Sequence, residues 1–295
     1  MIESNKENQQ IELSDGRKLG YAEYGDLNGK PIFYFHGYYG SRLEAKMLAY
    51  KAKEHGVRLI SVDRPGMGLS NFQPKRMLLD WPNDILELAD HLYLKRFVVA
   101  GVSGGGPYAA VCAFKIPDRL LCCGIISGMG PIEMTTKGMK RSNRILFFLI
   151  RRIPFIFSLL MKREMKEFNN PEKAKKTIEK AIKSLPEPDQ IVMKEPNFLE
   201  LFIEESKEAF RQGREGSVHE GRIYVKPWGF NPTNITPQLP VHLWHGELDV
   251  NVPISMGQRM SELIPNCTPK FYPNEAHLSV SINKIDEILE TLTSY

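Results

Sequence analysis

A chain of 295 residues, of which 42% are hydrophobic and 25% charged, has the composition of a globular protein that can bury a large core without disulfides or metals. Its net charge of +4 is too small to indicate a nucleic-acid partner, and none is expected. The charge is uneven, because residues 137–183 carry fourteen Lys or Arg against four Glu and the remainder is net acidic. No apolar stretch of about 18 residues and no signal-peptide pattern occurs, so a cytoplasmic protein is predicted.

The four cysteines show no metal-binding spacing, and free thiols are predicted at Cys112, Cys122, Cys123 and Cys267. No cluster of metal ligands is visible elsewhere. We therefore expect neither a metal nor a cofactor.

Short apolar runs alternate with helical patterns over the first 130 residues. Asp15-Gly16 separates two strand-like runs and predicts an N-terminal hairpin. The strands predicted next are 31–37, 58–66, 96–104 and 120–128. The helices predicted beside them are 41–55, 80–93 and 104–115. This alternation is typical of βαβ units and of an α/β fold with a mostly parallel sheet.

The alternation stops between residues 131 and 232, where only helical patterns occur. It resumes with the predicted strands 239–249 and 268–273 and the predicted helices 254–264 and 281–293. The predicted plan is an α/β core domain, made of residues 1–130 and 233–295, with a helical cap domain of residues 131–232 inserted into it.

One serine stands among glycines at the end of a predicted buried strand, in "GVSGG" (101–105). A serine on a very tight strand-to-helix turn is exposed as a nucleophile, and the residues two positions to either side must be small. Gly101 and Gly105 meet this requirement. A phosphate-binding loop fits less well, because neither a P-loop lysine nor a complete G-x-G-x-x-G follows. Ser103 is the candidate nucleophile.

A serine hydroxyl needs a general base, and the base needs an acid to orient it. His277 follows the last predicted strand, and Asp249 follows the strand before it. Both lie at the carboxyl ends of strands, where functional groups of parallel sheets gather. His245 is the alternative base and Glu247 the alternative acid.

Two backbone N–H groups are candidates for stabilising an oxyanion. Gly104 follows the nucleophile at the start of a helix. Tyr38 lies in "HGYYGS" (36–41), directly after an early strand, and Gly37 and Gly40 would let this backbone approach a substrate. A simple strand-to-helix turn is the alternative for this loop.

Five segments together resemble the α/β-hydrolase superfamily. They are "HGYYGS" (36–41), "DRPGMGLS" (63–70), "GVSGG" (101–105), "HGELDVNVP" (245–253) and "NEAHLS" (274–279). The resemblance implies an eight-stranded, mostly parallel sheet flanked by helices, with a helical cap after the sixth strand. It implies that Ser103, Asp249 and His277, in that order, form a catalytic triad, with Tyr38 and Gly104 in the oxyanion hole. Asp63 and Arg64 are expected to be structural.

Within the superfamily the chain is similar to esterases and lysophospholipases, and more distantly to proline iminopeptidases. It departs from the last group, which carries a Gly-Gly-Pro-Gly run after the first histidine and a Trp after the nucleophile. Tyr38, Tyr39 and Gly104 stand in these places. Dehalogenases and epoxide hydrolases use an aspartate where this chain has Ser103.

The inserted segment is expected to shape the substrate pocket. Residues 144–163, "RILFFLIRRIPFIFSLLMKR", are mostly apolar and include several basic residues. This composition fits a cap that contacts a membrane or lipid. It fits equally a pair of helices, broken at Pro154, that cover the core. Tyr39, Trp228 and Phe230 are candidate substrate-binding residues, although "KPWGFNP" (226–232) could equally pack at a hinge. The acidic residues Glu200, Glu204, Glu205 and Glu208 are expected on a solvated helix face.

We therefore predict a cofactor-independent serine hydrolase that cleaves carboxylic esters with acyl or small aromatic groups, acting on a small-molecule substrate. The same triad would serve an aminopeptidase, an amidase or a hydrolase of carbon–carbon bonds. A small-molecule receptor on a hydrolase fold is the alternative from another class.

Overall fold

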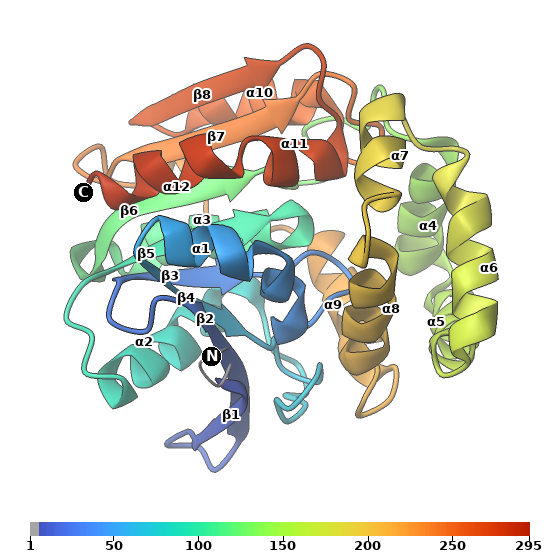
Figure 1. Ribbon diagram of the computed structural model, residues 1–295, viewed down its shortest axis with the longest axis horizontal. Coiled ribbons are helices and arrows are strands. Elements are labelled where there is room, and N and C mark those ends of the chain that lie inside the picture. Colours follow the sequence, from blue (N-terminus) through green and yellow to red (C-terminus); the bar gives the residue numbers. More distant parts are fainter. Residues whose placement is uncertain (1–5) are drawn as a thin grey trace.

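Eight strands form one sheet at the centre of the computed structural model, which describes residues 6–295 (Figure 1). In chain order they are β1 (Lys6–Glu12), β2 (Lys18–Gly25), β3 (Lys30–Phe35), β4 (Val57–Val62), β5 (Phe97–Val102), β6 (Leu120–Ile126), β7 (Val241–Gly246) and β8 (Cys267–Tyr272). Their order across the sheet is β1-β2-β4-β3-β5-β6-β7-β8. The predicted strands are confirmed, each within a few residues of its ends.

The sheet changes from antiparallel to parallel at β4. β1 pairs with β2, and β2 with β4, in antiparallel register, whereas β4, β3, β5, β6, β7 and β8 run parallel. The N-terminal hairpin forms as predicted, because Gly16 adopts the positive φ of 81° that its turn requires. The parallel strands therefore bring their carboxyl ends to one edge of the sheet.

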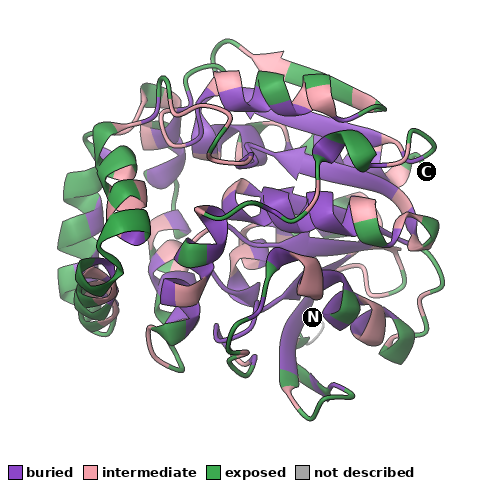
Figure 2. Cartoon of the chain, turned by 180° about the vertical axis from the view of Figure 1, so that it is seen from behind, coloured by how far each residue is buried: buried purple, intermediate pink, exposed green. Residues whose placement is uncertain are grey.

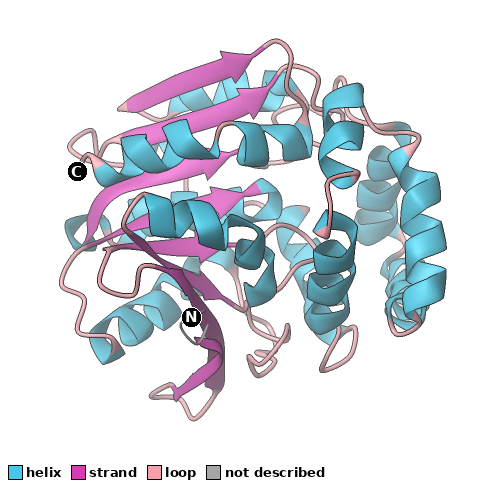
Figure 3. Cartoon of the chain, in the orientation of Figure 1, coloured by secondary structure: helices cyan, strands magenta, loops and turns pink. Residues whose placement is uncertain are grey.

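Helices cover both faces of the sheet, which Figure 3 shows as a central layer of strands. The 3-10 helix η1 (Arg42–Leu48), α1 (Ala49–Glu54), α11 (His277–Asn283) and α12 (Ile285–Thr293) lie on one side. α2 (Trp81–His91), α3 (Gly106–Lys115) and α10 (Ile254–Leu263) lie on the other. Side chains alternate between the two cores along β5, since Val99 belongs to one and Val98 to the other.

Two predicted helices differ in detail. Residues 42–48 of the predicted helix 41–55 form the 3-10 helix η1. The predicted helix 281–293 is two helices, because α11 begins already at His277 and ends at Asn283 before α12 starts. No Gly or Pro marks this break in the sequence.

The α-helices between β6 and β7 form one side of the molecule, on the right of Figure 1, and we call them the cap. They are α4 (Arg141–Arg152), α5 (Pro154–Phe168), α6 (Pro171–Ile182), α7 (Glu187–Met193), α8 (Phe198–Ala209) and α9 (Glu215–Tyr224). The break at Pro154 is where the sequence predicts it. Within the described residues, no helix is long and apolar enough to cross a membrane.

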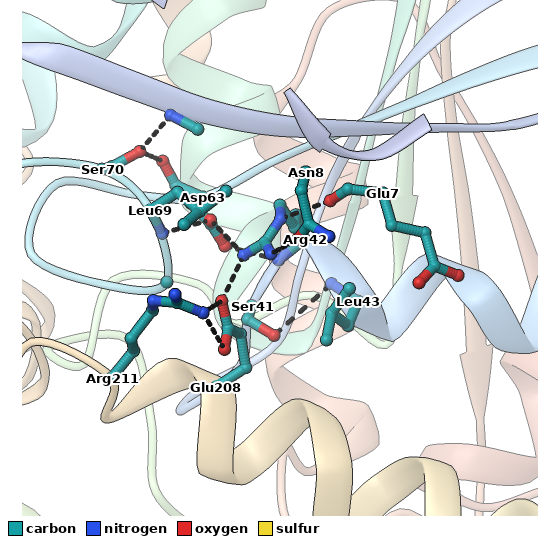
Figure 4. A network of polar contacts seen from close by, with 12 residues as sticks. Glu7, Asn8, Ser41, Arg42, Leu43, Asp63, Leu69, Ser70, Glu208 and Arg211 are labelled. Carbon is teal, nitrogen blue, oxygen red and sulfur yellow. Dashed lines mark hydrogen bonds and ion pairs between the residues drawn. The ribbon is translucent and has the colours of Figure 1, made fainter. Parts of the chain in front are cut away.

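Arg42 connects the cap to the sheet (Figure 4). Its guanidinium lies 2.9 Å from Asp63, at the end of β4, and 2.7 Å from Glu208 on α8. Asp63 also accepts hydrogen bonds from the N–H groups of Arg42 and Leu69. Because Arg42 and Asp63 are both buried, this network ties the cap to the turn after β4.

Candidate active site

Ser103 occupies a strained turn between β5 and the helical segment that continues into α3. Its φ is +54°, a value that costs a residue with a side chain on the order of 1–3 kcal/mol. A Cβ atom on Gly101 would lie 2.2 Å from the carbonyl oxygen of Gly105. A Cβ on Gly105 would lie 2.0 Å from the carbonyl oxygen of Phe35. Glycine at both positions therefore permits this turn, which holds the Ser103 hydroxyl outward.

The structure brings Ser103, His277 and Asp249 into one chain of hydrogen bonds. The distance from His277 Nε2 to Ser103 Oγ is 2.9 Å, and that from His277 Nδ1 to Asp249 Oδ2 is 2.7 Å. His277 is the first residue of α11, after β8, and Asp249 lies in the loop after β7. The side chains come from loops at the same edge of the sheet, as parallel strands dictate.

Asp249 is held as a carboxylate. Burial raises its pKa, but the charge of His277 and hydrogen bonds from His245 and His277 outweigh burial and bring the pKa to about 2. Its Oδ1 also accepts hydrogen bonds from the backbone N–H groups of Asn251 and Val252. These contacts fix the carboxylate so that one oxygen faces His277.

His277 is arranged as a base. Burial lowers its pKa, but the charge and hydrogen bond of Asp249 outweigh burial, and the pKa lies above the ordinary 6.5. The contact with Asp249 directs Nδ1–H toward the carboxylate, which leaves Nε2 to accept a proton from Ser103.

The alternative base and acid occupy other positions. His245 is buried with Nε2 2.8 Å from the carbonyl oxygen of Val252, and it lies 3.4 Å from Asp249. Glu247 is exposed to solvent. Neither has a hydrogen bond to Ser103 or His277 among residues 6–295. The geometry therefore favours Asp249 and His277 over these two residues.

The candidate oxyanion groups lie beside the serine. A Cβ on Gly104 would lie 2.9 Å from the Cβ of Tyr38, and a Cβ on Gly37 would lie 3.6 Å from that of Ser103. The Gly104 N–H is in the first helical turn, where no intrahelical acceptor exists. The Tyr38 N–H donates to no acceptor in the described part of the chain. Both groups are thus available to an oxyanion.

Arg64 holds the loop that carries Tyr38. Its guanidinium donates to the carbonyl oxygens of His36, at 2.6 Å, and Gly37, at 2.8 Å. The Gly37 carbonyl belongs to the same planar peptide as the Tyr38 N–H, which therefore points the opposite way. Glu44 accepts the N–H of Gly37 at 2.9 Å. The sequence predicts only a structural turn at Arg64 and does not place its side chain on this loop.

Glu220 on α9 of the cap compensates the charge of Arg64. Its Oε1 lies 2.7 Å from Arg64 Nε, its Oε2 contacts Arg76, and all three side chains are buried. Burial raises the Glu220 pKa, but the two guanidinium groups outweigh it and lower the pKa to about 2. The Tyr224 hydroxyl lies 2.6 Å from Glu220 and 2.9 Å from the Gly104 carbonyl oxygen. One buried network thus reaches both of the loops that carry the candidate oxyanion groups.

Tyr38 and Tyr39 join the same loop to the cap. The Tyr38 hydroxyl donates to the carbonyl oxygen of Ser217 on α9 at 3.0 Å. The Tyr39 hydroxyl donates to Glu164 on α5 at 2.8 Å, and its ring centroid lies 4.9 Å from that of Phe210. Tyr39, a candidate substrate-binding residue, is therefore in contact with the cap.

Trp228 and Phe230, the other candidate substrate-binding residues, lie elsewhere. Trp228 is buried in the core, and Phe230 stacks on Phe114 with ring centroids 4.7 Å apart. Phe114 is near the end of α3, opposite to the end where Ser103 lies. This placement favours the hinge-packing alternative, because the returning chain passes over the outer end of that helix.

The prediction that the acidic residues of α8 lie on a solvated face is wrong for two of the four, Glu205 and Glu208. Glu200 and Glu204 are exposed, but Glu205 is 2% exposed and Glu208 is paired with Arg42. The Glu205 carboxylate accepts the N–H of Ser41 at the start of η1. The reason is that α8 packs on η1, a contact that the pattern of charges along one helix does not reveal.

Asp189 on α7 of the cap is a residue that the sequence did not single out. Its carboxylate accepts hydrogen bonds from the backbone N–H groups of His277, Leu278 and Ser279 at 3.2, 2.9 and 2.9 Å. It thereby satisfies the free N–H groups at the start of α11 and fixes the backbone of His277. Its charge also favours protonated His277. We interpret Asp189 as a positioning residue.

Asp189→Asn should move the acidic limb of the pH–rate profile to lower pH. The substitution keeps one acceptor oxygen but removes a negative charge that raises the pKa of His277, so His277 stays neutral to lower pH. Asp189→Ala should in addition lower kcat by about tenfold to 100-fold, through misplacement of the imidazole. The measurement is kcat/KM for a p-nitrophenyl ester against pH.

Glu187→Gln is the matched control, because Glu187 is exposed on the same helix. It removes the same charge without touching α11, and its profile should coincide with that of the wild type. An acidic limb that stays in place in Asp189→Asn would contradict the assigned role.

Comparison with known proteins finds relatives of this chain. The family model described as alpha/beta hydrolase fold matches residues 30–283. A serine hydrolase-like protein from Dictyostelium discoideum is 24% identical over 52% of this chain and 45% of its own length. A non-heme chloroperoxidase from Burkholderia pyrrocinia is 25% identical over 92% of this chain and 94% of its own. The chain thus spans less than half the length of the Dictyostelium relative that it matches.

Solved structures show the same fold. An esterase from Exiguobacterium antarcticum superposes with a TM-score of 0.68 at 18% identity, over 98% of both chains. At this identity the similarity concerns the fold alone. The arrangement of strands and helices is what the two chains share.

Proposed function

The chain belongs to the alpha/beta hydrolase fold family, and from this premise we propose that it is a serine hydrolase of carboxylic esters that acts through an acyl-enzyme. Membership of the family and similarity to esterases support hydrolase chemistry. The single observation that carries the finer proposal is the continuous contact from Asp249 through His277 to Ser103, with distances of 2.7 and 2.9 Å.

In the proposed reaction, Ser103 Oγ attacks the ester carbonyl carbon while His277 Nε2 takes the hydroxyl proton. The resulting oxyanion accepts hydrogen bonds from the N–H groups of Tyr38 and Gly104. When the tetrahedral intermediate collapses, the bond to the leaving oxygen breaks and His277 returns its proton to the alcohol. A water molecule, deprotonated by His277, then attacks the acyl-enzyme, and Ser103 leaves as the free hydroxyl.

Asp249 contributes by stabilising the imidazolium that forms in each step. Its carboxylate, with a pKa of about 2, stays ionised while His277 gains and loses a proton. Arg64 keeps the Tyr38 N–H aimed at the oxyanion through the Gly37 carbonyl. A preorganised donor of this kind is worth about 10²–10³ in rate, because the group does not need to reorient during the reaction.

An apolar acyl group is the substrate feature that the cap favours. Tyr38 and Tyr39 pack against an apolar cluster of the cap that includes Ile150, Phe157 and Met161. These side chains come from α4 and α5, which lie over the loop next to Ser103. A hydrocarbon chain is attracted to apolar side chains of this kind, since its transfer from water releases about 0.8 kcal/mol per buried CH₂ group.

The proposal is tested with p-nitrophenyl acetate, butyrate and octanoate in stopped-flow progress curves. We expect steady turnover of all three, with kcat/KM highest for a longer acyl group. A fluorophosphonate probe should stop turnover by labelling Ser103. Matched anilides of the same acids serve as the comparison, and a preference for them would replace the ester assignment by amide hydrolysis. Binding of the esters without release of p-nitrophenol would favour the receptor alternative.

A further inference from the structure

The outer surface of α4 and α5 carries apolar side chains that no part of the described chain covers. We call this set the α4–α5 patch. It consists of Ile145, Phe148, Ile153, Phe155, Ile156 and Leu159, which are 50, 56, 39, 72, 40 and 48% exposed. The same helices bury Ile150, Phe157 and Met161 on their inner side. Figure 2 shows the outer helices of the cap largely exposed. The helices are thus apolar on both sides, whereas a solvated surface helix is polar outside.

Basic side chains surround the patch. α4 and α5 contain Arg141, Arg144, Arg151, Arg152, Lys162, Arg163 and Lys166. Within residues 6–295 none of these seven forms an ion pair, so their charges are uncompensated by the protein. The acidic residues of the two helices are otherwise engaged, because Glu164 accepts from the Tyr39 hydroxyl and Glu167 from the Thr177 hydroxyl.

We propose that the α4–α5 patch binds the surface of a lipid bilayer that contains anionic lipids. Helices that lie in a membrane interface have this composition, with exposed Phe, Ile and Leu beside Arg and Lys. Their apolar groups lie among the acyl chains, and their cations lie at the headgroups. A second copy of the chain is a poorer occupant. Two such surfaces facing each other would bring like charges together, because the two helices carry seven basic residues and only two acidic ones in each copy.

The position of the patch gives membrane binding a consequence for the site. The inner sides of α4 and α5 pack on Tyr38 and Tyr39, next to Ser103. A hollow of about 310 Å³ lies at the same surface, with Phe147, Phe148 and Arg151 in its wall. A bilayer in contact with the patch would therefore face the part of the cap that packs on Tyr38 and Tyr39. This inference goes beyond the proposed function, because binding requires no ester cleavage.

Flotation with lipid vesicles tests the proposal. The full chain is mixed at low salt with vesicles of phosphatidylcholine alone or with about 30% phosphatidylglycerol, and the bound fraction is measured. We expect binding to the anionic vesicles only. Phe148→Ser with Phe155→Ser, and separately Arg151→Glu with Arg152→Glu, should each weaken the partition coefficient at least about tenfold. Raising the ionic strength should release the wild type, which tests the charge contribution without a variant.

Matched controls change the same properties away from the patch. Lys95→Glu with Lys115→Glu alters the net charge equally at two exposed positions of the core, and Tyr93→Ser removes an aromatic residue that is 93% exposed. Both should bind as the wild type does. The proposal would be overturned if the controls lost vesicle binding as strongly as the patch variants do, or if the wild type did not bind anionic vesicles. It would also be overturned if sedimentation showed a dimer that the Phe148 and Phe155 substitutions abolish. We expect all variants to turn over p-nitrophenyl butyrate in solution at the wild-type rate. This measurement separates failure of the membrane proposal from failure of the hydrolase assignment.

Discussion

Replacing Ser103 by alanine should lower kcat on p-nitrophenyl esters by about 10⁶-fold and leave the fold intact. The substitution removes the oxygen that lies 2.9 Å from His277 Nε2 and that forms the acyl bond in the proposed reaction. The backbone is not expected to rearrange, because alanine meets the same steric conditions at the φ of +54°. Turnover is measured under saturating ester, and the fold is checked by the unfolding midpoint in urea.

Ser127→Ala is the matched control for this substitution. Ser127 also ends a strand, β6, has a positive φ of 44° and is fully buried. Its hydroxyl has no hydrogen-bond partner within the described residues and does not contact His277. Activity should survive in Ser127→Ala. Activity retained in Ser103→Ala at a tenth of the wild-type rate would mean that another group performs the cleavage.

The contact between Ser103, His277 and Asp249 could be predicted from sequence because each of these residues has a local signal. Ser103 stands between glycines that a tight turn requires, and His277 and Asp249 follow recognisable buried strands. The parallel order of the strands then brings these loops to one edge. No long-range packing needs to be known for this step.

The groups that surround Ser103, Asp249 and His277 could not be predicted, because they depend on how the cap packs. Asp189 meets the start of α11 although 88 residues separate it from His277. The sequence of its own helix predicts that Glu205 is exposed, but the residue is buried because α8 packs on η1. The choice between pocket and hinge for Trp228 and Phe230 also depends on packing, since composition does not say over which end of α3 the chain returns.

Glu220→Gln should lower the free energy of unfolding at pH 7 by about 3–5 kcal/mol. The substitution keeps the shape of the side chain but leaves Arg64 and Arg76 as buried cations without a counter-charge. The loss should depend on pH. The pKa of Glu220 falls from 4.5 to about 2 on folding, so its stabilisation is complete above pH 4.5 and disappears as the pH falls toward 2. Urea unfolding at pH 7 and at pH 3 measures both effects.

Glu204→Gln on α8 is the matched control, because its side chain is 50% exposed and lies 3.6 Å from Lys46. An exposed pair contributes about 0–1 kcal/mol, so this variant should unfold nearly as the wild type does. In Glu220→Gln we also expect kcat to fall, since Arg64 holds the Gly37 carbonyl and Tyr224 the Gly104 carbonyl. Equal stability of Glu220→Gln and wild type at pH 7 would show that the two arginines find other compensation. In that event the cap would not determine the geometry of the oxyanion loops.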